Sequence, residues 1–73
     1  MKTYLTLWFS SDGASPTEVV GELKQIGFRP VSGNYDMEYE WDRKPSVDDV
    51  LYLADMVRKR LEGKGVLFKL ETL

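Results

Sequence analysis

Ser10, Ser11, Asp12 and Gly13 form the segment of this chain best placed to do chemistry, since they leave a predicted strand and enter a predicted helix. Connections of this kind carry the functional residues of many proteins. The chain contains no His and no Cys, so a Ser-His-Asp mechanism is excluded because nothing could activate a serine in that way. Asp12 is the one catalytic candidate, and its structural alternative is a simple turn with Gly13.

A second pattern of chemical interest is the alternation between residues 35 and 41. One face of an extended strand would carry the aromatic and apolar side chains Tyr35, Met37, Tyr39 and Trp41. The other face would carry the acids Asp36, Glu38 and Glu40. Cation sites need ligands that converge from several segments, whereas residues two apart on one strand are spaced by ~7 Å. We therefore interpret the acids as a solvated face that pairs with Lys69, Lys2 or basic residues of a partner, and we expect no metal and no cofactor.

Six elements must position these residues. In chain order they are a strand over 3–9, a helix over 16–26, an edge strand over 28–31, a strand over 35–41, a helix over 47–61 and a strand over 66–72. Ser15 and Ser46 are predicted helix caps, with Pro16 at a first helical position and Glu18 placed for a capping box. Gly27 is expected to close the first helix in a left-handed conformation. Pro30 cannot donate to a strand ladder, which places its strand at an edge.

The order β-α-β-β-α-β resembles the ferredoxin-like split βαβ arrangement. The fold class predicted for the single domain 1–73 is therefore α+β, a four-stranded antiparallel sheet with two helices on one face. The right-handed crossover rule places the 3–9 and 35–41 strands in the centre. The strand residues expected to face the helices are Leu5, Leu7, Phe9, Tyr35, Met37, Tyr39, Val66, Phe68 and Leu70.

The face of the sheet opposite the helices, which we call the open face, is the predicted working surface. Its candidate interface residues are Tyr4, Thr6, Trp8, Asp36, Glu38, Glu40, Leu67 and Lys69. A Trp exposed beside a Tyr is typical of a contact surface. The leading hypothesis is a non-enzymatic binding or self-associating module, with a homodimer or a protein partner on the open face. The alternatives are that Trp8 merely shields the sheet of a monomer, or that it stacks on RNA. A sensor of a small ligand at a dimer seam is a further possibility that the sequence does not separate from the leading hypothesis.

Three carboxylates on the same face would repel RNA, and no segment contains the basic residue and Gly that precede stacking aromatics in RNA-recognition motifs. We therefore expect no nucleic-acid partner. The only basic cluster is Arg58, Lys59, Arg60 and Lys64. Its position near a helix C-terminus is explained by the helix dipole, with anion contact as the alternative.

The hairpin sequence GFRPVSGNYDMEYEW also resembles the central hairpin of the small ferredoxin-like nucleases associated with CRISPR systems. In that group, an acid near the end of the first strand meets its twin across a dimer and can bind a metal. The resemblance implies this role for Asp12 and makes a metal-dependent nuclease the alternative function. The chain departs from the group at the end of the first strand, where it reads Trp8-Phe9-Ser10-Ser11 in place of a Tyr-Asp-Ile type ending.

Composition sets broader limits. The 73 residues carry a formal net charge of −2, which provides no overall field that would attract nucleic acid or an anionic membrane. No apolar run approaches the ~20 residues of a membrane span, and no signal peptide is recognisable at Met1-Lys2. We therefore expect no membrane association and a cytoplasmic location. Without disulfides, the fold must be stabilised by packing.

Overall fold

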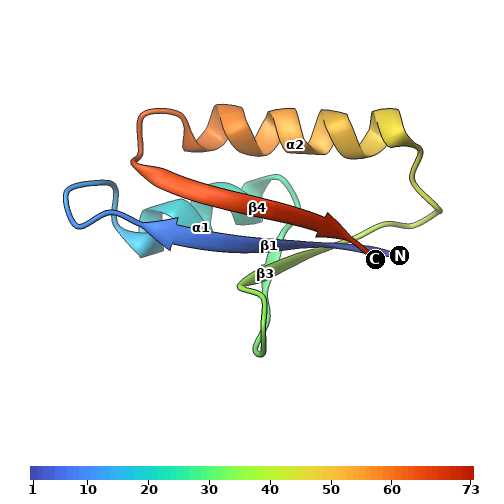
Figure 1. The fold of residues 1–73 in the computed structure, drawn as a ribbon, viewed down its shortest axis with the longest axis horizontal. Helices are drawn as coiled ribbons and strands as arrows, with labels where there is room; N and C mark the ends of the chain where they lie inside the picture. Colours follow the sequence, from blue (N-terminus) through green and yellow to red (C-terminus); the bar gives the residue numbers. More distant parts are fainter.

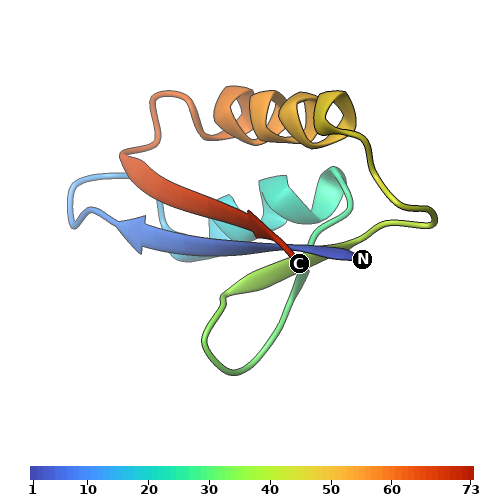
Figure 2. The same ribbon diagram turned by 45° about the vertical axis from the view of Figure 1, so that its right-hand side comes forward.

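The computed structural model describes residues 1–73 and contains two helices and a four-stranded sheet (Figure 1). The elements are β1 (Lys2–Phe9), α1 (Pro16–Gln25), β2 (Arg29–Pro30), β3 (Met37–Glu40), α2 (Val47–Leu61) and β4 (Val66–Thr72). The strand order is β2-β3-β1-β4, and each neighbouring pair is antiparallel. The predicted α+β class is confirmed, and the order is consistent with a ferredoxin-like arrangement. Both helices lie on one side of the sheet, and the two termini lie close together (Figure 2).

The start of α1 follows from its cap. Ser15 has an extended backbone, its hydroxyl accepts a hydrogen bond of 3.2 Å from the N–H of Glu18, and Pro16 holds the first helical position. Glu18 does not complete the expected capping box, because its carboxylate binds Nζ of Lys64 at 2.6 Å instead. Gly27 follows the helix with a φ of +110°, as predicted, and a Cβ there would also collide with the ring of Tyr39.

The start of α2 is held by a complete capping box between Ser46 and Asp49. The N–H of Asp49 donates to the Ser46 hydroxyl over 3.1 Å, and the N–H of Ser46 donates to the Asp49 carboxylate over 2.9 Å. Nη1 of Arg43 also donates to that carboxylate at 2.8 Å. The hydrogen bond from Arg43, followed by the bond from the Ser46 backbone, lowers the pKa of Asp49 to about 2.

The central hairpin is less regular than the sequence predicts. Instead of spanning 28–31 and 35–41, its strands cover only Arg29–Pro30 and Met37–Glu40. The shortening begins at Asp36, whose N–H donates to the carbonyl of Leu5 (2.9 Å) while its carboxylate accepts a hydrogen bond from the N–H of Leu7 (2.8 Å). The Asp36 carboxylate therefore takes the place of the backbone carbonyl that a longer β3 would have offered to the N–H of Leu7.

The hydrophobic core lies between the sheet and the helices. Its buried members are Leu5, Leu7, Val19, Leu23, Phe28, Met37, Leu53, Val57 and Leu61. Tyr39, Val66, Phe68 and Leu70 pack against this core and are partly buried, as expected from their strand positions. The prediction that Phe9 faces the core is wrong, since it is 41% exposed. Phe9 ends β1 opposite the first residue of β4, Val66, at the end of the sheet.

Polar groups inside the fold are paired. Nε1 of Trp41 donates to Oγ1 of Thr3 over 2.8 Å, and Oγ1 of Thr3 lies 2.8 Å from Oγ1 of Thr72. Thr3 is fully buried, so these bonds satisfy a hydroxyl that has no access to water. No buried side-chain nitrogen or oxygen lacks a hydrogen-bond partner. Neither helix has the length and apolar character needed to cross a bilayer.

Candidate interaction surface

The apolar end of the open face is formed where β1 and β4 run side by side. Trp8 lies directly opposite Leu67, and their exposed fractions are 52% and 74%. Thr6 lies opposite Lys69 on the same face, next to this pair. The alternation of β1 explains the exposure, because Leu5 and Leu7 point into the core and the residues that alternate with them, Thr6 and Trp8, must point away. Two large apolar side chains are thus adjacent and in water.

A second aromatic group lies further along the face. The rings of Tyr4 and Tyr35 stack with centroids 4.6 Å apart and planes inclined by 22°. The prediction that Tyr35 faces the core is therefore wrong. Regular β3 begins only at Met37, so the strand alternation that would have turned Tyr35 inward does not extend to it. The sequence alone offered no signal for this stack, because it depends on where the ladder ends.

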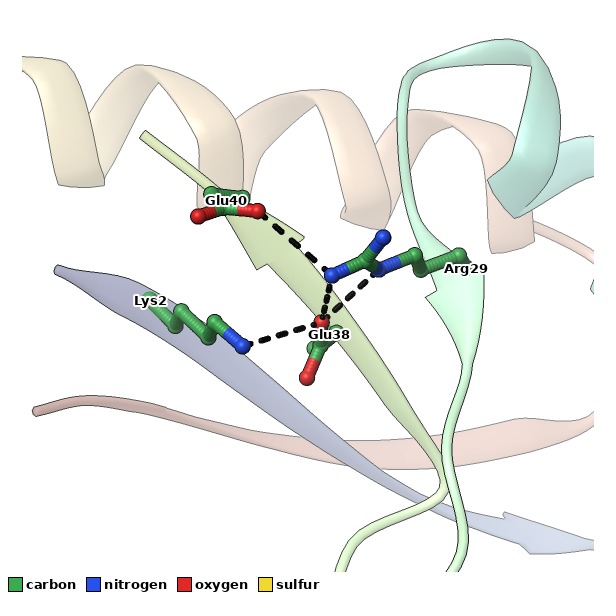
Figure 3. A network of polar contacts seen from close by, with 4 residues as sticks. All are labelled: Lys2, Arg29, Glu38 and Glu40. Carbon is green, nitrogen blue, oxygen red and sulfur yellow. Dashed lines mark hydrogen bonds and ion pairs between the residues drawn. The ribbon is translucent and has the colours of Figure 1, made fainter. Parts of the chain in front are cut away.

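The charged end of the open face is a network of four side chains from three strands (Figure 3). Glu38 is at its centre: its Oε2 accepts a hydrogen bond from Nε of Arg29 at 2.8 Å and forms ion pairs with Nη2 of Arg29 at 2.6 Å and Nζ of Lys2 at 3.3 Å. Glu40 contributes a weaker contact, 3.4 Å from Nη2 of Arg29. The network arises because Arg29 is the register partner of Glu38 across the β2–β3 pair.

Glu38 is buried and paired with cations, unlike the acids of a solvated face. Glu38 is only 6% exposed, so it is not the solvated acid that the sequence predicts. The hydrogen bond from Arg29, together with the one from Lys2, holds the pKa of Glu38 below its ordinary value. The same partnership raises the pKa of the Arg29 guanidinium. Glu38 therefore stays ionised and is covered by cations.

Asp36 is exposed, but one oxygen of its carboxylate is used within the sheet, where it accepts the backbone N–H of Leu7. Apart from Asp36, the charged side chains on the open face comprise three cations and three carboxylates: Lys2, Arg29, Lys69, Glu38, Glu40 and Glu71. This balance differs from the acidic face that the sequence predicts. It still offers no excess of positive charge to attract a phosphate backbone.

Asp12 lies in an exposed loop whose flanks are well fixed. The hydroxyl of Ser10 donates to the carbonyl of Gly65 over 2.7 Å, and the N–H of Ala14 donates to the carbonyl of Lys64 over 2.9 Å. Gly13 packs so closely against Lys64 that a Cβ would come 2.5 Å from its carbonyl oxygen. No group of three or more Asp, Glu, His or Cys side chains in the structure is arranged to hold a metal ion.

The basic cluster near the end of α2 is partly used within the fold. Nη1 of Arg60 contacts Glu22 at 3.2 Å and Gln25 at 2.8 Å on α1, and Lys64 pairs with Glu18. The Arg60 contacts tie α2 to α1, and the Lys64 contact ties the loop after α2 to α1, which accounts for two of the four cations. Arg58 and Lys59 lie exposed in the last turn of α2, where positive charge complements the helix dipole.

The open face is therefore apolar around Trp8 and Leu67, aromatic at Tyr4 and Tyr35, and charge-paired around Glu38. Side chains of this kind can bind a partner by burial and stacking. Comparison of the chain with protein-family models, with curated proteins and with solved structures found no match.

Proposed function

We propose that this protein is a non-enzymatic binding or self-associating module whose contact surface is the open face of its sheet. The observation that carries the proposal is the pairing of Trp8 with Leu67, two large apolar side chains left in water side by side on an uncovered face. Burying such a pair removes apolar area from water, and Trp is the residue type most often dominant in protein interfaces. The stacked rings of Tyr4 and Tyr35 extend this apolar area.

The charged end of the face supports a role in orientation. Lys2, Arg29 and Glu38 hold one another in a fixed network, so a partner meets side chains that are already ordered. Pre-ordered groups lose less conformational entropy on binding than free ones. Trp8 and Leu67 would supply affinity, and the network beside them would select the orientation of the partner.

The fluorescence of Trp8 itself reports whether the open face is covered. The chain contains two Trp residues, and Trp41→Phe leaves Trp8 as the only one. In that variant, we expect acrylamide quenching of Trp8 fluorescence to fall when the face is covered. A fall with rising protein concentration indicates a second copy on the face, whereas a fall only on adding a recovered partner indicates a foreign protein.

The mutational test is Trp8→Lys, which should abolish the contact and leave the fold intact. Tyr52→Lys is the matched control, because Tyr52 is 69% exposed on α2, away from the open face. The proposal is contradicted if Trp8 is equally quenched under all conditions and if Trp8→Lys recovers the same partners as the wild type. Circular dichroism checks that each variant is folded.

A further inference from the structure

The outer edge of β4 is an unused line of backbone hydrogen-bonding groups. At the end of this strand, the N–H of Lys2 donates to the carbonyl of Leu73 (3.2 Å), and the N–H of Leu73 donates to the carbonyl of Lys2 (3.0 Å). In an antiparallel pair the direction of these groups alternates. The N–H and C=O groups that point away from β1 are therefore those of Val66, Phe68, Leu70 and Thr72.

No strand lies beyond β4, which is the last in the order β2-β3-β1-β4. The strand contains no Pro and pairs with β1 residue for residue from Thr72 back to Val66, so no bulge interrupts it. Natural sheets usually protect an edge of this length with such devices, because a free edge can accept another strand. On β4 the only protection of this kind comes from the charged side chains of Lys69 and Glu71. They oppose an incoming strand unless that strand places opposite charges across from them.

Apolar side chains of α2 flank the same edge. Val47 and Leu51 are 76% and 57% exposed. Together with Val50 they line a hollow of about 220 Å³ whose other wall includes Thr72 of β4. A second hollow lies between the end of α2 and the start of β4, where Leu61 and Phe68 contribute to its walls. A strand added to β4 would thus also bring apolar surface of α2 out of water.

We propose that a second copy of this chain pairs with β4 through its own β4, antiparallel, with Leu70 opposite Leu70 of the second copy. In this register Lys69 lies opposite Glu71 of the second copy, and the same contact recurs on the other side of the two-fold axis. Leu67, 74% exposed, lies opposite Leu73, 64% exposed. Phe68 lies opposite Thr72 on the sheet face that carries the helices. The backbone groups of Phe68, Leu70 and Thr72 form hydrogen bonds across the joint, by which we mean the line where the two β4 strands pair.

Charge decides between this register and its neighbours. A shift that moves each residue's partner by two positions places Lys69 opposite Lys69 and Leu67 opposite Glu71. It adds one hydrogen-bonded residue pair, but it sets like charges directly opposite each other. A shift in the other direction places Glu71 opposite Glu71 and Lys69 opposite Leu73, so it also sets like charges across the joint. Only the Leu70-centred register pairs both charges with opposite charges and also sets Leu67 opposite Leu73. Lys69 and Glu71 already contact each other at 3.3 Å within one chain, so both lie on the same face, available to the joint.

This inference goes beyond the proposed function, because it concerns the edge of the sheet and not its open face. The two-fold axis keeps both pairs of helices on the same side, so the α2 helices of the two copies lie along the joint with Val47 and Leu51 between them. The open faces also become one continuous surface, with two Trp8 side chains on it. Trp8→Lys should therefore leave this dimer unchanged.

Sedimentation equilibrium of the intact chain tests the proposal. We expect a dimer whose dissociation constant rises at least tenfold in Lys69→Glu and in Glu71→Lys, since each puts like charges opposite each other. The double variant Lys69→Glu/Glu71→Lys should restore dimerisation, and an equimolar mixture of the two single variants should form a heterodimer. Lys24→Glu, with the same charge change at an exposed position of α1, is the matched control and should dimerise like the wild type. A chain that stays monomeric at high concentration, or a dimer indifferent to both reversals, would overturn the proposal.

Disulfide trapping tests the register. The chain has no Cys, so single-cysteine variants give an unambiguous result. In the proposed register, residues 69 and 71 of opposite copies form a non-hydrogen-bonded pair with Cα atoms ~4.5 Å apart, within the disulfide range of ~4.4–6.8 Å. A mixture of Lys69→Cys and Glu71→Cys should cross-link several times faster than either alone. Faster cross-linking of Lys69→Cys with itself would show the shifted register and refute the one proposed.

Discussion

The carboxylate of Asp36 accepts the backbone N–H of Leu7 at 2.8 Å and so supplies a hydrogen bond that β3 is too short to make. β3 pairs with β1 only from Lys2 to Leu5. Beyond that point the N–H of Leu7 would have no acceptor within the sheet. A side chain that the alternation pattern places among the open-face acids thus completes the pairing of the central strands.

Asp36→Ala should lower the free energy of unfolding by about 1–2 kcal/mol, because the N–H of the buried Leu7 is left without a partner. Asp36→Asn keeps an acceptor oxygen in the same place and should cost about half as much or less. Urea denaturation followed by circular dichroism measures both. Equal losses in the two variants would show that charge, and not the acceptor, is what matters at this position.

The cap of α2 predicts a dependence of stability on pH. The folded pKa of Asp49 is about 2, below the ordinary value of 3.8, because the ionised carboxylate binds Arg43 and the Ser46 N–H. Its contribution is complete above pH 3.8 and is lost as the pH falls through about 2. Asp49→Asn should therefore flatten the fall in unfolding free energy over that interval. Asp48→Asn, which removes a charge from the same turn, is the control, and identical profiles for the two variants would contradict the assignment.

Two glycine substitutions should have opposite effects. Gly13→Ala should lower the free energy of unfolding by about 2 kcal/mol or more, because its Cβ would come 2.5 Å from the carbonyl oxygen of Lys64. Gly21→Ala should raise it by about 0.5–1 kcal/mol, since Gly21 lies within α1 and its Cβ would meet nothing within 4 Å. Thermal unfolding of the pair measures both signs, and a neutral Gly13→Ala would mean that the two loops are not tightly packed.

The nuclease alternative makes its own prediction at Asp12. If the protein is a binding module, the purified chain should not cleave RNA or DNA with magnesium or manganese, and Asp12→Asn should give the same result. Gel assays on labelled single- and double-stranded substrates measure this. Metal-dependent cleavage that disappears in Asp12→Asn would favour the nuclease and count against the open-face proposal.

The order of elements is predictable from this sequence because local chemistry specifies it. Ser15-Pro16 and the Ser46–Asp49 capping box are readable within four residues, and both helices begin there. The alternation of β1 likewise places Leu5 and Leu7 in the core. Such signals require no knowledge of which strand lies beside which.

The sequence predicts the contact of Lys2 with an acid of this face, but it does not predict the burial of Glu38 or its bond to Arg29, because these depend on pairing between strands. Glu38 is buried only because Arg29 of β2 is its register partner and Lys2 of β1 is within reach. Alternation gives the face on which a side chain lies, but it does not say which neighbour will cover it. Tyr35 illustrates the same limit, since its stack on Tyr4 follows from the early end of β3.

The two-residue strand β2 limits how far the sheet can grow. The N–H of Val31 bonds to the carbonyl of Asp36, so Arg29 and Val31 face β3 and Pro30 faces outward. Pro30 has no N–H to offer an incoming strand. Two copies joined at β4 would present only this blunted edge at both ends of their common sheet. Assembly would then stop at two chains and would not continue into a fibre.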